Sequence, residues 1–303
     1  MEEIQMHHFR RGLDAEVEKA AKDFFSSGIG KKIIEADYCG RPAFQVCIRN
    51  NYLNVYWRGC SVLKYYPLPE QFTIHYKYVE AKKPGKNKNY VKLDSFEGDL
   101  RFNKDWGFSK KIIEPAYDGN IPCLKNYCDP HGEKSRLSTY IDHEEPLLMD
   151  LEVAFSRIND KDDNKKDFVA DRIDMAELVM QDNSPVLRLV EVKLAADPRL
   201  RSISRPEIMT QMKRYREFLS IQKPNILDSY MKIARNYKEL GITQIDNKIL
   251  DQFIEHPILH SEPHLLVLGT LQDLRGREES CHWATLKTLF NEDRFPEPRL
   301  LEI

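Results

Sequence analysis

The sequence predicts an α/β protein, in which a mixed sheet flanked by helices follows an α+β region built on an antiparallel meander. Two observations support this prediction. Before residue 135, short aromatic and β-branched runs alternate with turn-forming residues, whereas the later part alternates helical patterns with buried-type strands. We therefore expect two domains, residues 1–135 and residues 136–303, each long enough for its own core.

The first domain is expected to open with a helix over residues 13–27, where apolar residues recur at helical spacing. Four predicted strands follow, over residues 43–48, 52–57, 61–66 and 72–79. The segment 82–92 contains five lysines and no acid, and it is expected to be an exposed loop, with a DNA clamp as the alternative. Residues 105–140 are irregular and rich in Gly, Pro and Asn, which is typical of a boundary.

The second domain shows a more regular pattern. A helix is predicted over residues 144–157, with Pro146 near its start, where proline is tolerated. Two strands, 168–179 and 186–195, are expected on either side of a turn. Further helices are predicted over 204–221, 226–240, 247–256 and 283–290, with a buried strand over 264–271.

Composition excludes several classes of protein. Of the 303 residues, 41% are hydrophobic and 31% are charged, as in a globular protein. No apolar run approaches the roughly 20 residues of a membrane span, and the start lacks the pattern of a signal peptide. Six scattered cysteines do not form the framework of a disulfide-rich domain. We therefore expect a cytoplasmic protein with no membrane partner.

Charge differs between the two halves. Residues 1–135 contain 22 Lys+Arg and 18 Asp+Glu, a net charge of +4, whereas the remainder contains 24 and 30, a net charge of -6. If the partner is a nucleic acid, the first domain has the more favourable long-range field.

One apolar strand contains a carboxylate and an amine two residues apart. Glu191 and Lys193 would share a face of that strand, and burying either charge without a partner is costly. If Val179 and Val186 are the last pair before the turn, partner numbers sum to 365 and Asp174 lies opposite Glu191. Two carboxylates at such a short distance repel each other unless a cation lies between them. A buried ion pair would explain Glu191 and Lys193 alone, whereas the addition of Asp174 favours Mg²⁺ or Mn²⁺.

Three side chains from the predicted helices are expected to face the same point. Glu152 falls on one helical stripe with Leu148 and Phe155, which directs this third carboxylate toward the sheet. Gln211 and Tyr215 are four residues apart on the following helix and so lie one above the other.

Asp174, the Glu-Val-Lys run that ends at Lys193, and the spacing of Gln211 and Tyr215 resemble the PD-(D/E)XK nuclease superfamily. The Gln-x-x-x-Tyr element is similar to that of its RecB-like branch, and the resemblance covers roughly residues 145–270. It implies a restriction-endonuclease-like mixed sheet for the second domain. The chain has Arg-Ile-Asp where the motif has Pro-Asp, and Asp171 is an alternative to Asp174.

The resemblance implies metal-dependent hydrolysis of phosphodiester bonds. The implied ligands of one or two Mg²⁺, or of Mn²⁺ in its place, are Asp174, Glu191, Glu152 and the Val192 carbonyl. Lys193 would orient or deprotonate the attacking water or stabilise charge, and Gln211 and Tyr215 would position that water or the DNA backbone. The expected function is that of a deoxyribonuclease in microbial DNA processing, repair or defence. The alternatives are an RNase, or a non-catalytic module that binds nucleic acid or protein.

Other polar clusters are weaker candidates. Basic residues after the candidate strand could contact phosphates, namely Arg199, Arg201, Arg205, Lys213, Arg214 and Arg216. Cys123, Cys128 and His131 have a loosely zinc-like spacing, for which Cys281 or His282 would have to be the fourth ligand. The first domain is expected to recognise DNA, to pair subunits as a homodimer, or to bind another protein.

Overall fold

The computed structural model describes residues 9–37, 40–57, 59–75, 90–93, 132–159, 167–201, 206–270, 273 and 282–302. The chain divides into two compact units. The meander unit takes residues 11–144 and 232–247, and the site unit takes residues 1–10, 145–231 and 248–303. The prediction of two independent domains, with a boundary between residues 135 and 136, is a separate statement, and it stays a prediction. Among the helices described, none is long and apolar enough to cross a membrane.

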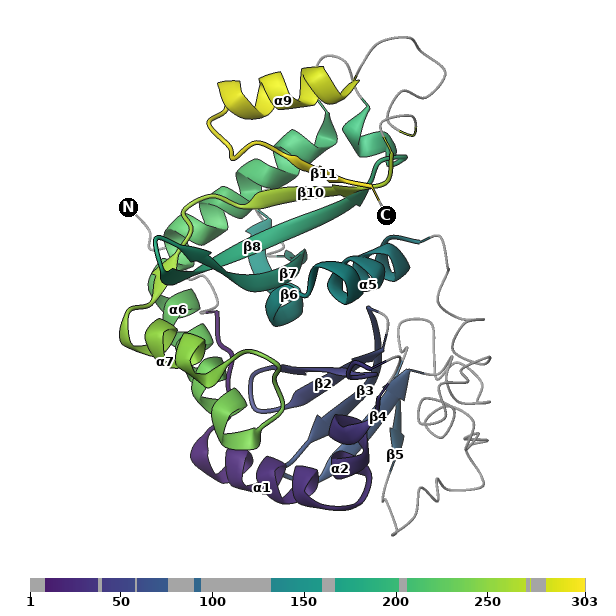
Figure 1. The fold of residues 1–303 in the computed structure, drawn as a ribbon, viewed down its shortest axis with the longest axis vertical. Coiled ribbons are helices and arrows are strands. Elements are labelled where there is room, and N and C mark those ends of the chain that lie inside the picture. The colour runs from purple at the N-terminus through teal and green to yellow at the C-terminus, as the bar shows by residue number, and fades with distance from the viewer. Residues whose placement is uncertain are drawn as a thin grey trace. The chain divides into compact units, whose positions relative to one another are not determined.

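The meander unit contains the predicted antiparallel sheet (Figure 1). Its strands are β1 (Gln45–Ile48), β2 (Leu53–Trp57), β3 (Cys60–Tyr66), β4 (Gln71–His75) and β5 (Tyr90–Leu93), paired in that order. Its helices are α1 (Ala15–Ser26), α2 (Gly28–Glu35) and α5 (Glu133–Glu144). Phe24 of α1 stacks on Tyr65 of β3, with 3.9 Å between ring centroids, so α1 covers a face of the sheet. The opening helix and the meander are therefore confirmed.

The site unit is built on a mixed sheet, as the sequence predicts. Its strands are β6 (Leu147–Asn159), β7 (Asp167–Gln181), β8 (Ser184–Leu194), β9 (Ile258–Leu259), β10 (His264–Leu268) and β11 (Arg299–Leu301). The order is β11-β10-β8-β7-β6, with β9 also paired to β8. β6, β7 and β8 are antiparallel, whereas β10 runs parallel to β8. Its helices are α6 (Glu207–Leu240, which continues into the meander unit), α7 (Asn247–Glu255) and α9 (His282–Glu292).

The prediction of a helix over residues 144–157 is wrong, because from Leu147 onward this segment belongs to the strand β6. Its apolar residues fit two periods. Met149, Leu151, Val153 and Phe155 alternate and are all buried, which is the period of a strand. β7 supplies a partner along the length of β6, so pairing selects the strand period over the helical stripe.

The hairpin of β7 and β8 has the predicted register. Val179 pairs with Val186, and the pairing continues to Gln181 and Ser184 around the turn. Asp182 and Asn183 have φ angles of 49° and 62°. A two-residue turn with both φ values positive matches the twist of a hairpin, and Asp and Asn tolerate that conformation better than most residues. The turn therefore sets which residues of β7 and β8 face each other.

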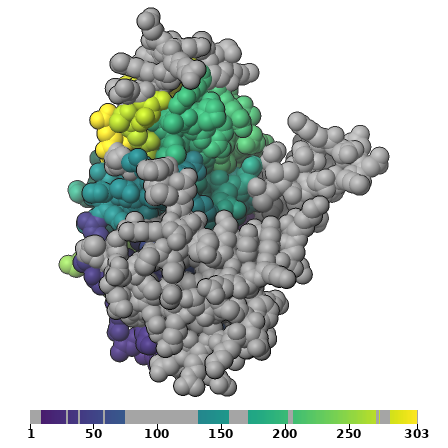
Figure 2. Space-filling view, turned by 90° about the vertical axis from the view of Figure 1, so that its right-hand side faces the viewer, coloured from purple at the N-terminus to yellow at the C-terminus, as the bar shows by residue number. Residues whose placement is uncertain are grey.

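Helix α6 supplies the apolar cover of the sheet within the site unit. Phe218 of α6 stacks on Phe155 of β6, with ring centroids 3.8 Å apart. Phe9 packs against the same helix, edge-on to Phe218 at 5.7 Å and stacked on Tyr230 at 6.1 Å. Figure 2 shows the C-terminal residues (yellow) on the surface beside residues from the middle of the chain, as expected from the pairing of β11 to β10 and of β10 to β8.

Candidate active site

The candidate site lies where the pairing of β7 and β8 ends. The last paired residues are Met175 and Val190, so Asp174 and Glu191 occupy the next opposed positions. The Asp174 Oδ2 atom accepts a hydrogen bond from the Val192 N–H at 2.8 Å. The Asp174 side chain therefore accepts a backbone N–H just beyond the last strand pair, and this hydrogen bond holds its carboxylate beside Glu191.

Lys193 brings the oxygen atoms of this site together. Its Nζ atom donates to the Glu191 carboxylate and, at 2.7 Å, to the Val192 carbonyl, and it lies 3.9 Å from the Asp174 Oδ2 atom. The side chains of Lys193 and Glu191 are each 2% exposed, whereas that of Asp174 is 21% exposed. The site is therefore a buried cation–carboxylate pair beside a second carboxylate that is only partly exposed.

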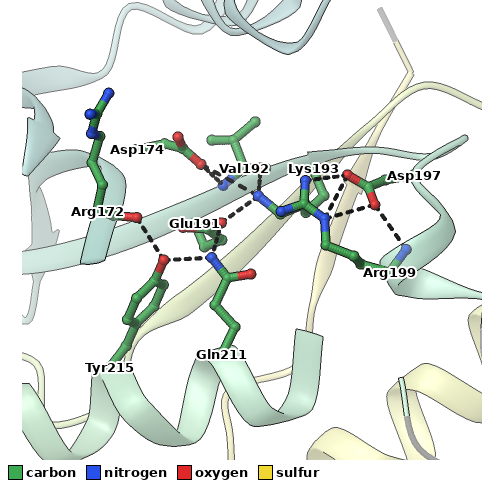
Figure 3. A network of polar contacts seen from close by, with 9 residues as sticks. All are labelled: Arg172, Asp174, Glu191, Val192, Lys193, Asp197, Arg199, Gln211 and Tyr215. Atoms are coloured by element: carbon green, nitrogen blue, oxygen red, sulfur yellow. Dashed lines mark hydrogen bonds and ion pairs between the residues drawn. The ribbon is translucent and has the colours of Figure 1, made fainter. Parts of the chain in front are cut away.

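Helix α6 adds an amide and a phenol to the same network (Figure 3). The Gln211 Nε2 atom donates to Glu191 Oε1 at 2.6 Å and to the Tyr215 hydroxyl at 2.5 Å. That hydroxyl donates in turn to the Arg172 carbonyl at 2.6 Å. Burial, followed by the nearby charge of Glu191, raises the pKa of Tyr215 well above its ordinary value. Tyr215 is therefore a neutral support that orients Gln211, and Gln211 orients Glu191.

The electrostatics of Asp174 reflect this environment. Burial, and then the neighbouring charge of Glu191, raise its pKa from the ordinary 3.8 to about 7, although Lys193 and the Val192 N–H act in the opposite direction. Glu152 contributes a smaller increase. At neutral pH the Asp174 carboxylate is thus near its titration midpoint, chiefly because burial disfavours its charged form and also because Glu191 repels it.

The structure places Glu152 on a strand rather than on the predicted helix. It lies between Leu151 and Val153, whose partners in β7 are Met175 and Ile173, and so across from Asp174. Its φ angle of 52° interrupts the regular ladder there. Its carboxylate bonds the Arg172 guanidinium at 2.8 Å. This third carboxylate is therefore close enough to influence Asp174 but is bonded to an arginine.

Asp171, the alternative to Asp174, interacts with an arginine of helix α6. The Asp171 Oδ2 atom lies 3.5 Å from the Nε atom of Arg214 on α6. Asp174, in contrast, bonds β8 beside Glu191. The structure therefore places Asp174, the residue that the predicted register selects, beside Glu191, whereas Asp171 lies beside Arg214.

Asp197 and Arg199 form a bonded pair beside the site that the sequence analysis did not predict. Asp197 follows β8 and caps the short 3₁₀ turn η4 (Pro198–Leu200) by accepting the Arg199 N–H at 2.8 Å. The same carboxylate chelates the Arg199 guanidinium through Nε at 3.0 Å and Nη2 at 2.6 Å. Burial alone would raise the pKa of Asp197, but these bonds to Arg199, together with the charge of Lys193, lower it. The Asp-Pro pair at a turn start was the available signal.

The predicted phosphate-binding cluster has internal partners in this structure. The described members are Arg199 with Asp197, Arg201 with the Asp273 carbonyl, Lys213 with Asp293, Arg214 with Asp171 and Arg216 with Glu262. Arg205 lies in a part of the chain that the structure does not describe. Protein groups thus offset much of this charge, and contact of these residues with phosphates stays a prediction.

The thiol and lysine predictions fall mostly on segments that are not described. Cys123, Cys128, His131 and Cys281 lie there, as do residues 82–89 of the lysine-rich segment, whereas Lys92 belongs to β5. Cys60 is disulfide-bonded, and Cys47 is a buried free thiol. A disulfide is not expected in the reducing cytoplasm, and the cytoplasmic location stays a prediction.

A divalent metal could bind oxygen ligands at this site, but the described residues do not provide a cluster of three carboxylates. Across the described ranges, no three His, Cys, Asp or Glu side chains form a metal-ligand group. The available donors are the Asp174 and Glu191 carboxylates and the Val192 carbonyl. Mg²⁺ commonly binds through one or two carboxylates and keeps several waters, so this donor set fits Mg²⁺.

Comparison of the chain with known protein families, with curated proteins and with solved structures gives no match.

Proposed function

We propose that this protein is a Mg²⁺-dependent deoxyribonuclease that hydrolyses phosphodiester bonds. The observation that supports the proposal most strongly is the convergence of two carboxylates and a backbone carbonyl on one lysine ammonium, at the open end of a strand pair. This arrangement of Asp174, Glu191 and Lys193 supports the proposal, together with their resemblance to PD-(D/E)XK nucleases. From Asp174 onward, the order of strand β7, strand β8, helix α6 and strand β10 agrees with that resemblance, whereas Glu152 lies on the strand β6 instead of the expected helix.

Each residue has a distinct proposed role. The carboxylates of Asp174 and Glu191 and the Val192 carbonyl would hold the metal. Bound Mg²⁺ would lower the pKa of a coordinated water and offset charge that develops on the phosphorane. Lys193 would orient the attacking water or stabilise charge on the phosphorane oxygens. Gln211 keeps the Glu191 carboxylate in place.

The mixed environment of Asp174 supports a cation-binding role rather than a purely structural one. A structural ion pair would be complete with one carboxylate and one ammonium, as Glu191 and Lys193 already are. Asp174 adds a second carboxylate that is partly open to solvent and whose pKa is raised to about 7. Such a perturbed carboxylate beside a charge partner is characteristic of functional sites.

The proposed nuclease would meet DNA through groups near the site. The Arg172 and Arg199 side chains are partly exposed, and each is held by a carboxylate that fixes its direction. A fixed guanidinium loses little conformational freedom when it binds a phosphate. The meander unit would recognise DNA, bring together two copies of the chain or bind another protein.

The decisive experiment is a cleavage panel. Single-stranded, double-stranded, nicked and branched DNA, together with RNA, would be incubated with Mg²⁺, with Mn²⁺ and with EDTA. We expect DNA cleavage that EDTA abolishes and that Glu191→Gln and Lys193→Met each reduce by at least about 100-fold. Matched control substitutions are Glu207→Gln on α6 and Lys287→Met on α9, which alter the same residue types at exposed positions to which no role in the site is assigned.

Other results would assign a different function. Cleavage confined to RNA would make the protein an RNase. Nucleic-acid binding without cleavage under either metal, unaffected by Glu191→Gln and Lys193→Met, would favour the non-catalytic binding module. Circular dichroism of each variant would establish that the comparison concerns folded proteins.

A further inference from the structure

The ammonium of Lys193 occupies the point where the candidate metal ligands meet. It donates to Glu191 and to the Val192 carbonyl, and the Asp174 carboxylate lies 3.9 Å away. These are the three groups that supply oxygen atoms for a divalent cation. The protein therefore already contains one cation among these oxygens.

Two cations cannot use these oxygens independently. Lys193 and Glu191 are almost fully buried, and electrostatic interactions in a buried site are screened less than those in water. A divalent ion on the same oxygens would meet an ammonium within a few ångströms, and like charges at that separation repel strongly. The hydrogen bonds from Nζ would also direct the ligand oxygens toward lysine.

Gln211 gives the Glu191 carboxylate a second anchor. Its Nε2 atom bonds Glu191 Oε1 at 2.6 Å from helix α6, independently of Lys193 on β8. Departure of the ammonium would therefore leave Glu191 oriented by Gln211, and Asp174 oriented by the Val192 N–H. These two bonds do not involve Lys193.

We propose that Lys193 is an intramolecular competitor of the divalent metal, and that metal binding displaces its ammonium from Glu191 and the Val192 carbonyl. The inference rests on the proposed function in one respect, that the ligand is a divalent metal. It follows that Lys193 weakens metal binding while serving catalysis, so metal affinity and activity change in opposite directions when Lys193 is replaced.

The test measures Mn²⁺ binding by electron paramagnetic resonance, on the full chain freed of metal with EDTA. We expect Lys193→Met and Lys193→Gln to bind Mn²⁺ at least tenfold more tightly than the wild type. Lys287→Met is the matched control, because it removes another ion-paired lysine, the partner of Glu297, and it should leave the affinity unchanged. Glu191→Gln should abolish this binding in every background and thus identifies the site.

The outcomes separate the inference from the proposed function. Glu191-dependent Mn²⁺ binding that is unchanged or weaker in folded Lys193→Met would overturn the competition and leave the metal site intact. Binding that depends on Glu191 in neither the wild type nor the lysine variants would remove the metal site and with it the proposed nuclease.

A second measurement needs no substitution at Lys193. Lysine acetylation, quantified by mass spectrometry on the wild-type protein, should increase at the buried Lys193 when Mg²⁺ is added, relative to Lys213. Labelling of Lys193 that does not increase at saturating Mg²⁺ would contradict displacement of its ammonium. This measurement also covers the case in which the lysine variants do not fold.

Discussion

Replacing Asp174 by Asn removes a charge that the fold disfavours and keeps an acceptor for the Val192 N–H. Burial and Glu191 raise the pKa of Asp174 from 3.8 to about 7 in the folded protein. A carboxyl whose folded-state pKa lies above the unfolded value contributes fully to stability below the unfolded pKa, and this contribution is lost as the pH rises through the folded pKa. At 1.36 kcal/mol per pKa unit, the charged form costs roughly 4 kcal/mol once the pH reaches 8.

Urea unfolding in EDTA, at intervals from pH 4 to pH 8, measures this cost. We expect the stability of Asp174→Asn, relative to the wild type, to increase by roughly 4 kcal/mol over this range, or more than about 1 M in midpoint for an m-value near 3 kcal/mol/M. Parallel pH profiles of the two proteins would show that the charged form of Asp174 carries no such cost. Asp197→Asn is a control of opposite sign, because the pKa of Asp197 is lowered and its stabilisation is present at neutral pH and lost on acidification.

Three further predictions concern buried contacts of the site unit, each measured by urea unfolding. Tyr215→Phe removes the hydroxyl that bonds Gln211 and should cost about 1–3 kcal/mol, so an unchanged midpoint would contradict the network. Arg188→Ala leaves the Glu177 carboxylate, 2% exposed, without its 2.6 Å partner and should cost about 3–5 kcal/mol. Burial raises the pKa of Glu177, so this loss should be larger at pH 8 than at pH 5, and replacing both residues by Leu should recover most of it. Phe9→Ala should cost about 3–5 kcal/mol if the ring anchors α6, and a loss below about 1 kcal/mol would show that it does not.

The central part of the site was predictable because local rules determine it. A two-residue turn sets the register of a hairpin, so counting back from Val179 and Val186 was enough to bring Asp174 beside Glu191. Helical spacing likewise placed Gln211 and Tyr215 one turn apart on a helix. Neither inference needs knowledge of distant contacts.

The strand that contains Glu152 was not predictable in the same way. Its apolar residues satisfy the helical and the strand period at once, and pairing with β7 decides between them. The left-handed backbone at Glu152 adds a local irregularity that no propensity of glutamate indicates.

The partners of the arginines were also outside the reach of sequence patterns. Arg216 pairs with Glu262, which is far along the chain, and its guanidinium lies 3.8 Å from the centroid of the Phe295 ring. Such contacts depend on how α6 packs against later segments. A basic cluster in the sequence therefore predicts a charge that the folded protein partly neutralises.

The parallel pairing of β8 with β10 has a consequence for synthesis on the ribosome. Glu191 and Lys193 lie on the stretch of β8 whose neighbour is His264–Leu268, which is translated about 70 residues after β8 ends. Until that segment emerges, the hairpin of β7 and β8 presents an unpaired strand edge, a template for association with other chains. The newly made chain would therefore be most prone to aggregation during this interval, and chains that end before β10 should accumulate in the insoluble fraction.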